Sequence, residues 1–249
     1  MTGVLAATFV LPGLAIGSFL NVVASRVPLR MPIGTTRSAC ASCGTGIHWY
    51  DNVPLISYAV LRGRCRACAA PIALRYPAVE GVTALLVVGS VLRFGPTPAG
   101  LLAAFFCCAL VAIAAIDVEH RIVPNRIVIP AAAITLLGHT AIDPSPEWAY
   151  GAAAGFGGLL VIALLNPRGM GMGDVKLCLL LGAMLGWNVF LALFLGVLAG
   201  TVPALVLAFK YGVGARKLAI PFAPFLLVGA VVTLFAGDTL LDWWSGLFA

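Results

Sequence analysis

The segment that decides the fold class reads AGLLAAFFCCALVAIAAID over residues 99–117. Its uncharged part, 99–116, has about the length that a helix needs to cross a lipid bilayer. The segment ends on Asp117, and a second aspartate, Asp174, follows Gly171-Met172-Gly173. An ionisable residue at membrane depth is costly and indicates a functional site. Two such acids in separate apolar segments predict one shared site, because carboxylates that share a proton can activate water for peptide cleavage.

The whole chain has the composition of a polytopic membrane protein. Of its 249 residues 61% are hydrophobic and 10% are charged, whereas a soluble domain typically carries about 25% charged residues. The apolar runs are long and unbroken, which favours helices over the alternating strands of a membrane β-barrel. The net charge of +6 is dispersed between apolar runs without a recognition motif, so we expect no nucleic-acid partner.

The apolar stretches predict an all-α fold of about eight transmembrane helices. They lie at 4–25, 78–94, 99–116, 127–142, 148–165, 175–209 and 218–241. The stretch 175–209 is too long for one span, and a turn at Gly186-Trp187-Asn188 would divide it into two.

The basic residues predict the orientation of these helices. The first Lys or Arg is Arg26, after the first apolar run, which favours an outside N-terminus and an inside loop at 26–77. Alternation of the spans then leaves one of the 15 basic residues, Arg93, outside and places the C-terminus outside. The same alternation puts Asp117 and Asp174 on the cytoplasmic side, although neither was used to derive it.

The loop at 26–77 contains two Cys-x-x-Cys pairs. Cys40 and Cys43 form the first pair, and Cys65 and Cys68 form the second. Their spacing predicts a four-cysteine zinc site, and a closed shell of four thiolates is typical of a structural metal. A redox or disulfide role, free thiols, and replacement of one ligand by His48 are the alternatives; a reducing cytoplasm disfavours disulfides.

The order of these motifs resembles that of the prepilin peptidases, or type IV leader peptidases, which are Gly-x-Gly-Asp aspartic membrane proteases. The similar stretches are GSFLNVV at 17–23 with RVP at 26–28, the cysteine pairs, DNVPLISY at 51–58, LRGRC at 61–65, RYP at 75–77 with Glu80, Asp117 with IVPN at 122–125, and GMGDVK at 171–176. The resemblance covers residues 11 to about 185, and the last spans match only as hydrophobic helices. Ala41 stands where proline is common in the family.

The resemblance implies a bifunctional, multi-pass enzyme of the bacterial inner membrane. Such enzymes cleave the leader of type IV prepilins or type II secretion pseudopilins on the cytoplasmic side, and many then N-methylate the new N-terminus with S-adenosylmethionine. Asp117 and Asp174 align with the catalytic aspartates. Gly171 and Gly173 would let a substrate strand approach the backbone, and Lys176 would bias the local charge or meet lipid phosphates. The candidate contributors to methylation are Asn21, Arg26, Asp51 and Glu80.

The expected organisation has three parts. Residues 1–25 form the first transmembrane helix, 26–77 a cytoplasmic four-cysteine zinc domain linked to N-methylation, and 78–249 a transmembrane aspartic peptidase bundle. One alternative function is a peptidase without methyltransferase activity, since no Rossmann-type glycine turn is visible. A second is a transporter with Asp117 and Asp174 as proton or cation sites. A purely structural alternative makes Asp174 a helix cap and Arg121 the partner of Asp117.

Overall fold

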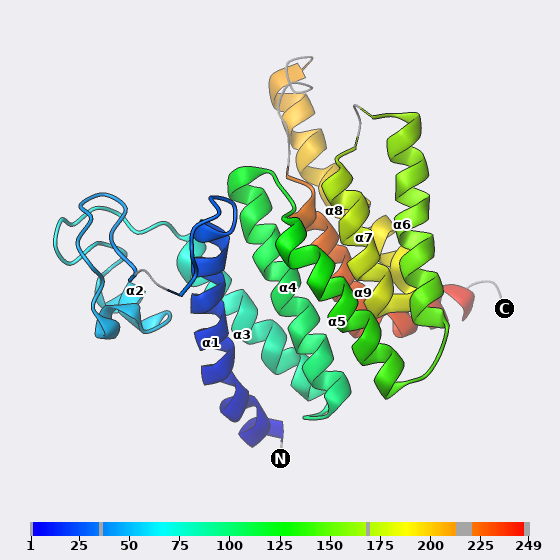
Figure 1. Ribbon diagram of the computed structural model, residues 1–249, viewed down its shortest axis with the longest axis horizontal. Coiled ribbons are helices and arrows are strands. Elements are labelled where there is room, and N and C mark those ends of the chain that lie inside the picture. Colours follow the sequence, from blue (N-terminus) through cyan, green and yellow to red (C-terminus); the bar gives the residue numbers. More distant parts are fainter. Residues whose placement is uncertain (1, 35–36, 168–169, 213–220, 247–249) are drawn as a thin grey trace. The chain divides into compact units, whose positions relative to one another are not determined.

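The computed structural model describes residues 2–34, 37–167, 170–212 and 221–246 (Figure 1). Within these ranges the chain forms α-helices and two short 3-10 helices, and no β-strand. The α-helices are α1 (Thr2–Arg26), α2 (Ile56–Val60), α3 (Arg75–Phe94), α4 (Pro98–His120), α5 (Asn125–Ile142), α6 (Glu147–Leu165), α7 (Met172–Leu185), α8 (Val189–Tyr211) and α9 (Ala223–Gly246). The 3-10 helices are η1 (Trp49–Asn52) and η2 (Gly186–Asn188). The predicted all-α class is therefore confirmed.

Among the described residues, 7 helical segments are long and apolar enough to cross a membrane. They are Gly3–Arg26, Arg75–Phe94, Pro98–His120, Asn125–Ile142, Glu147–Leu165, Met172–Tyr211 and Ala223–Gly246. The 40-residue segment Met172–Tyr211 contains two helices, α7 and α8, joined by η2. The turn predicted at Gly186–Asn188 is thus confirmed, and the segments fit a multi-pass membrane protein. The start predicted for the last span, residue 218, lies outside the described residues.

The chain divides into two compact units, Met1–Ile116 and Asp117–Ala249, with the division inside α4. In the first unit, α1 packs against α3 through glycine. A Cβ added to Gly13 would lie 2.7 Å from Cα of Ala84, and one added to Gly17 would lie 2.7 Å from Cα of Glu80. Helices approach this closely only where side chains are absent, which is the usual route to helix association in lipid.

In the second unit, α7 is the central helix. Val175, Leu177 and Leu181 of α7 are fully buried, and α7 contacts both α5 and α6. A Cβ on Gly182 would overlap the backbone of Gly151 in α6. A 14-residue helix that is buried along its length keeps its first turn in a fixed place, and that first turn carries Asp174.

Candidate active site

Asp117 lies in the last turn of α4, and the backbone leaves the helix at Arg121. The amide of Arg121 donates to the carbonyl of Asp117 at 2.8 Å, and Arg121 has a φ of 54°. A residue in this left-handed conformation ends a helix and redirects the chain. The connection 121–124 then runs to α5, which begins at Asn125. Asp117 itself is 6% exposed.

Asp174 lies in the first turn of α7. The N-cap of this helix is Gly171, whose extended backbone has φ −76° and ψ 139°. The amide of Asp174 donates to the carbonyl of Gly171 at 3.1 Å, so Asp174 sits inside the turn and does not cap it. The cap alternative for Asp174 therefore does not describe the structure.

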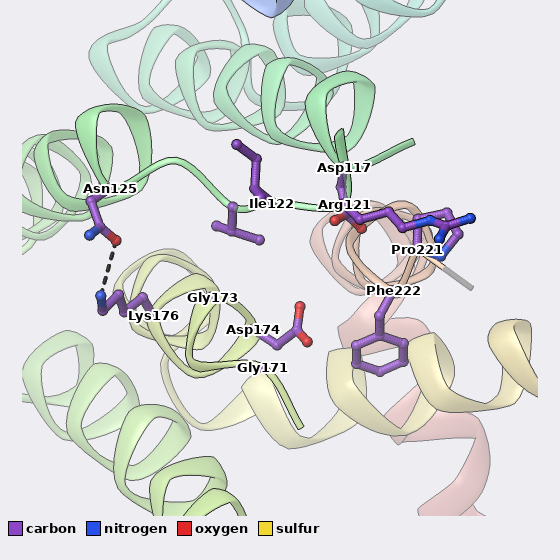
Figure 2. A pocket seen from close by; sticks show the side chains of 11 residues that line it. Asp117, Arg121, Ile122, Asn125, Gly171, Gly173, Asp174, Lys176, Pro221 and Phe222 are labelled. Atoms are coloured by element: carbon purple, nitrogen blue, oxygen red, sulfur yellow. Dashed lines mark hydrogen bonds between the residues drawn. The ribbon is translucent and has the colours of Figure 1, made fainter. Parts of the chain in front are cut away.

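The two aspartates line one pocket of the second unit, with a volume of about 440 Å³. The lining residues are Asp117, Arg121, Ile122, Val123, Asn125, Gly171, Gly173, Asp174, Lys176, Pro221 and Phe222. Figure 2 shows the two carboxylates directed into the same space from α4 and α7. The structure thus brings together Asp117 and Asp174, 57 positions apart in sequence, with Gly171, Gly173 and Lys176.

One wall of this pocket was not predicted from the sequence. Oδ2 of Asp117 accepts the backbone N–H of Ala223 at 3.0 Å, and the preceding Pro221 and Phe222 line the pocket. The last spans were interpreted only as hydrophobic helices, and a backbone amide carries no residue-type signal. The signal in the sequence that a helix begins near Ala223 is the pair of prolines Pro221 and Pro224.

Lys176 closes another side of the pocket. Its Nζ donates to Oδ1 of Asn125 at 3.0 Å (Figure 2). This contact links the N-terminal part of α7 to the first residue of α5, so Lys176 holds two pocket elements together.

The four cysteines of the 26–77 loop come together in the first unit. The Sγ atoms of Cys40, Cys43, Cys65 and Cys68 all lie within 4.8 Å of one another. Sγ of Cys40 is 3.9 Å from Sγ of Cys68, close to the roughly 3.8 Å that separates two thiolates on a tetrahedral zinc with Zn–S bonds of about 2.3 Å. The cluster therefore has the composition and size to hold zinc. His48 is stacked on Tyr50, with ring centroids 5.1 Å apart, and is not part of the cluster among the described residues.

Each cysteine pair forms the same turn. The amide of Cys40 donates to the carbonyl of Thr45 at 2.9 Å, and the amide of Cys65 donates to that of Ala70 at 2.8 Å. Amides inside the turns lower the pKa of two thiols: those of Cys43 and Ser42 face Cys40, and those of Cys68 and Ala67 face Cys65. Such turns stabilise thiolates, the form in which cysteine binds a metal.

The candidate methylation residues make contacts within the first unit. Nδ2 of Asn21 donates to the carbonyl of Tyr76 at 3.0 Å, and Nη1 of Arg26 donates to that of Ile33 at 2.7 Å. Oε2 of Glu80 accepts the amide of Leu55 at 2.9 Å. These three side chains are buried and join the loop to α1 and α3.

Asp51 lies apart from those three residues, on the loop. Its carboxylate accepts two hydrogen bonds from Arg66, at 2.8 Å and 2.6 Å. The hydrogen bonds and charge of Arg66 hold the pKa of Asp51 below its usual value. Arg66 stands between Cys65 and Cys68, so this ion pair braces the second cysteine turn.

The apolar helices and the pocket lined by two acids define a class: a polytopic membrane protein with a candidate site of the aspartic-protease type. The profile of the type IV leader peptidase family matches residues 104–237, and that of the bacterial peptidase A24 N-terminal domain matches residues 11–94. The chain belongs to the type IV leader peptidase family. The family predicted from the sequence motifs is thereby confirmed, and with it the enzyme class, a membrane leader peptidase.

Several similar proteins carry the name prepilin leader peptidase/N-methyltransferase. The protein of Burkholderia pseudomallei (strain 1026b) is 34% identical over 95% of this chain and 87% of its own length. That of Bacillus subtilis (strain 168) is 33% identical over 93% of this chain and 94% of its own length. That of Xanthomonas campestris pv. campestris is 34% identical over 92% of this chain and 91% of its own length. No solved structure matches the chain significantly.

Proposed function

We propose that this enzyme cleaves the leader peptides of type IV prepilins or type II secretion pseudopilins with Asp117 and Asp174 as the catalytic pair, and then N-methylates the new N-terminus. The observation that carries the proposal is the pocket in which both carboxylates face one space. The shared name of the relatives supports both activities and the prepilin substrate. A transporter function has no comparable support, since the family to which the chain belongs is one of peptidases.

The chemistry follows from two carboxylates beside a peptide bond. Like charges in one site disfavour double ionisation, so the pair holds one proton. The ionised carboxylate takes a proton from a water molecule, and the resulting hydroxide forms a bond to the scissile carbonyl carbon. The protonated carboxyl donates its proton to the carbonyl oxygen. The carboxyl that took the water's proton then gives it to the leaving nitrogen, the C–N bond breaks, and the other carboxylate takes a proton from a hydroxyl of the intermediate, which leaves the pair with one proton again.

The depth of the pocket suits a substrate with a polar leader and an apolar helix. α7 has 14 residues and is about 21 Å long at about 1.5 Å per residue, shorter than the hydrocarbon core of about 30 Å. Because α7 begins at the pocket and the basic residues put this end toward the cytoplasm, we propose that Asp174 lies within the apolar layer, toward its cytoplasmic edge. That is where a bilayer-embedded helix would present its junction with a leader.

The orientation we propose has this edge on the cytoplasmic face of the bacterial inner membrane, with both termini outside. It is supported by the basic residues, of which only Arg93 falls on the outer side. In this orientation the cysteine cluster also faces the cytoplasm, and the lipid bilayer is the surrounding medium.

Zinc and a methyl donor complete the proposal. Cys40, Cys43, Cys65 and Cys68 would hold a structural zinc, which would fix the 26–77 segment as a cytoplasmic domain linked to methylation. S-adenosylmethionine, when bound, would supply the methyl group. Asn21, Arg26, Asp51 and Glu80 are proposed to support methylation indirectly, by shaping the loop and its attachment to α1 and α3.

One experiment tests both activities. The purified full-length enzyme is incubated with a prepilin in detergent micelles, with and without S-adenosylmethionine, and the product masses are measured. We expect a new N-terminus in both reactions and an added methyl mass only with the donor. An intact prepilin would contradict the peptidase, and an unmethylated product in both reactions would favour the peptidase without methyltransferase activity.

A further inference from the structure

The N-terminus of α9 meets the carboxylate of Asp117. Oδ2 accepts the N–H of Ala223, the first residue of α9, across 106 positions of sequence. The first amides of a helix have no acceptor within the helix, and this end carries a partial positive charge. Asp117 supplies the missing acceptor, and both groups are buried, with 6% and 1% exposure.

The α9 terminus is held firmly enough to fix that carboxylate. Leu226, one turn into α9, is fully buried. A Cβ on Gly229 would lie 2.5 Å from the backbone nitrogen of Gly196 in α8, so the two helices touch backbone to backbone. Pro224 at the second helical position restricts the backbone further. The Ala223 amide is therefore a rigid donor.

The two aspartates differ in the hydrogen bonds that their side chains accept. Within residues 2–34, 37–167, 170–212 and 221–246, no hydrogen bond to the side chain of Asp174 is found, whereas the carboxylate of Asp117 accepts the N–H of Ala223 at Oδ2 and also faces the N–H of Phe222. The donor within hydrogen-bond distance of Oδ2, the N–H of Ala223, fixes the rotation of the Asp117 carboxylate in the pocket. A carboxylate that can rotate freely would spend only part of its time in that geometry.

We propose that Ala223, through its backbone N–H, is the positioning residue of the reaction: it holds Oδ2 of Asp117 and so keeps this carboxylate in the orientation in which it shares the pocket with Asp174. This inference rests on the proposed function. It adds α9 as a third helix of the site, beside α4 and α7, which carry the two aspartates. Phe222 places its side chain in the same pocket (Figure 2). The start of α9 therefore forms part of the pocket wall and also donates a hydrogen bond to Asp117.

The test replaces the amide without changing the side chain. Lactic acid incorporated at position 223 of the full-length enzyme gives a backbone ester, which lacks the N–H. The matched control is the hydroxy-acid analogue of tyrosine at position 150, because the Tyr150 amide donates to the carbonyl of Pro146 at 3.0 Å in the first turn of α6. Both esters remove a hydrogen bond of equal length from a helix start, and only one removes it from the pocket.

We expect the ester at 223 to lower kcat for prepilin cleavage by about tenfold to a hundredfold relative to the ester at 150, the usual effect of removing a donor from a charged group. KM for the prepilin and the thermal midpoint should match the control within error. Ala223→Pro is the second variant, because proline is favoured at a first helical position and also lacks the N–H. It should show the same loss of kcat in a folded protein.

Two results would overturn the inference. Equal kcat in the two esters would mean that the amide positions nothing, and a loss of kcat accompanied by a higher KM and a lower thermal midpoint would assign Ala223 a structural role only. An unsubstituted enzyme that leaves the prepilin intact would instead contradict the proposed function itself, and the inference with it.

Discussion

Gly173 lies against Val123, so closely that no side chain fits between them. A Cβ added to Gly173 would be 2.9 Å from Cβ of Val123 and 3.1 Å from its Cγ2. Val123 belongs to the connection that follows Asp117, and Gly173 precedes Asp174. From the sequence, this glycine was expected to admit a substrate strand, whereas in the structure the room beside it is filled by the chain itself.

Gly173→Ala should therefore separate the two halves of the site. The added methyl would displace Val123 or the first turn of α7 by a few tenths of an ångström or more, and we expect the rate of leader cleavage to fall by about tenfold or more. The measurement is the initial cleavage rate of a prepilin at equal amounts of folded enzyme. Gly157→Ala is the control, because nothing lies within 4 Å of a Cβ at Gly157 in α6. Equal rates for the two variants would contradict the close approach as the reason for a glycine here.

The cysteine cluster predicts the metal content of the purified protein. We expect about one zinc per chain, and near-complete loss when Cys40, Cys43, Cys65 and Cys68 are all changed to serine, since zinc prefers four thiolates in this geometry. Elemental analysis of the two proteins measures this. Cys108→Ser serves as the control, because Cys108 lies in α4 outside the cluster. Zinc retained after all four changes would refute the ligand set.

The two cysteine turns differ at the position that follows each pair. Gly44 follows the first pair with a φ of 72°, and Ala69 follows the second with a φ of 57°. An L-residue is strained in this left-handed region and glycine is not, so Ala69→Gly should stabilise the loop by about 0.5–1 kcal/mol and Gly44→Ala should destabilise it by about 1–2 kcal/mol.

Competition for zinc by a chelator measures that difference, because metal release requires the turns to open. Gly46→Ala is the matched control: a Cβ at Gly46 would meet nothing within 4 Å, and its backbone lies outside the left-handed region. Faster zinc release from Ala69→Gly than from the unsubstituted protein would show that backbone strain at Ala69 does not lower the stability of the turn.

Much of this architecture is predictable from the chain because the relevant signals are local. Apolar length locates the helices, and paired cysteines at fixed spacing locate the cysteine cluster. The distribution of basic residues also predicts that Asp117 and Asp174 lie on a common side. The contribution of Ala223 was not predictable in this way, because it is a backbone amide placed by long-range packing. The contact between Lys176 and Asn125 is similar: both residues lie in motifs, but their pairing depends on how α7 meets α5.

The central claim is that Asp117 and Asp174 together cut the leader. The most direct measurement compares initial rates of prepilin cleavage by the unsubstituted enzyme, Asp117→Asn and Asp174→Asn, each at the same zinc content and thermal midpoint. Asparagine keeps the shape of the side chain and removes the carboxylate, so we expect each variant to be at least about a thousandfold slower, as for other catalytic groups that act as a unit. Cleavage at the unsubstituted rate by either variant would contradict the account.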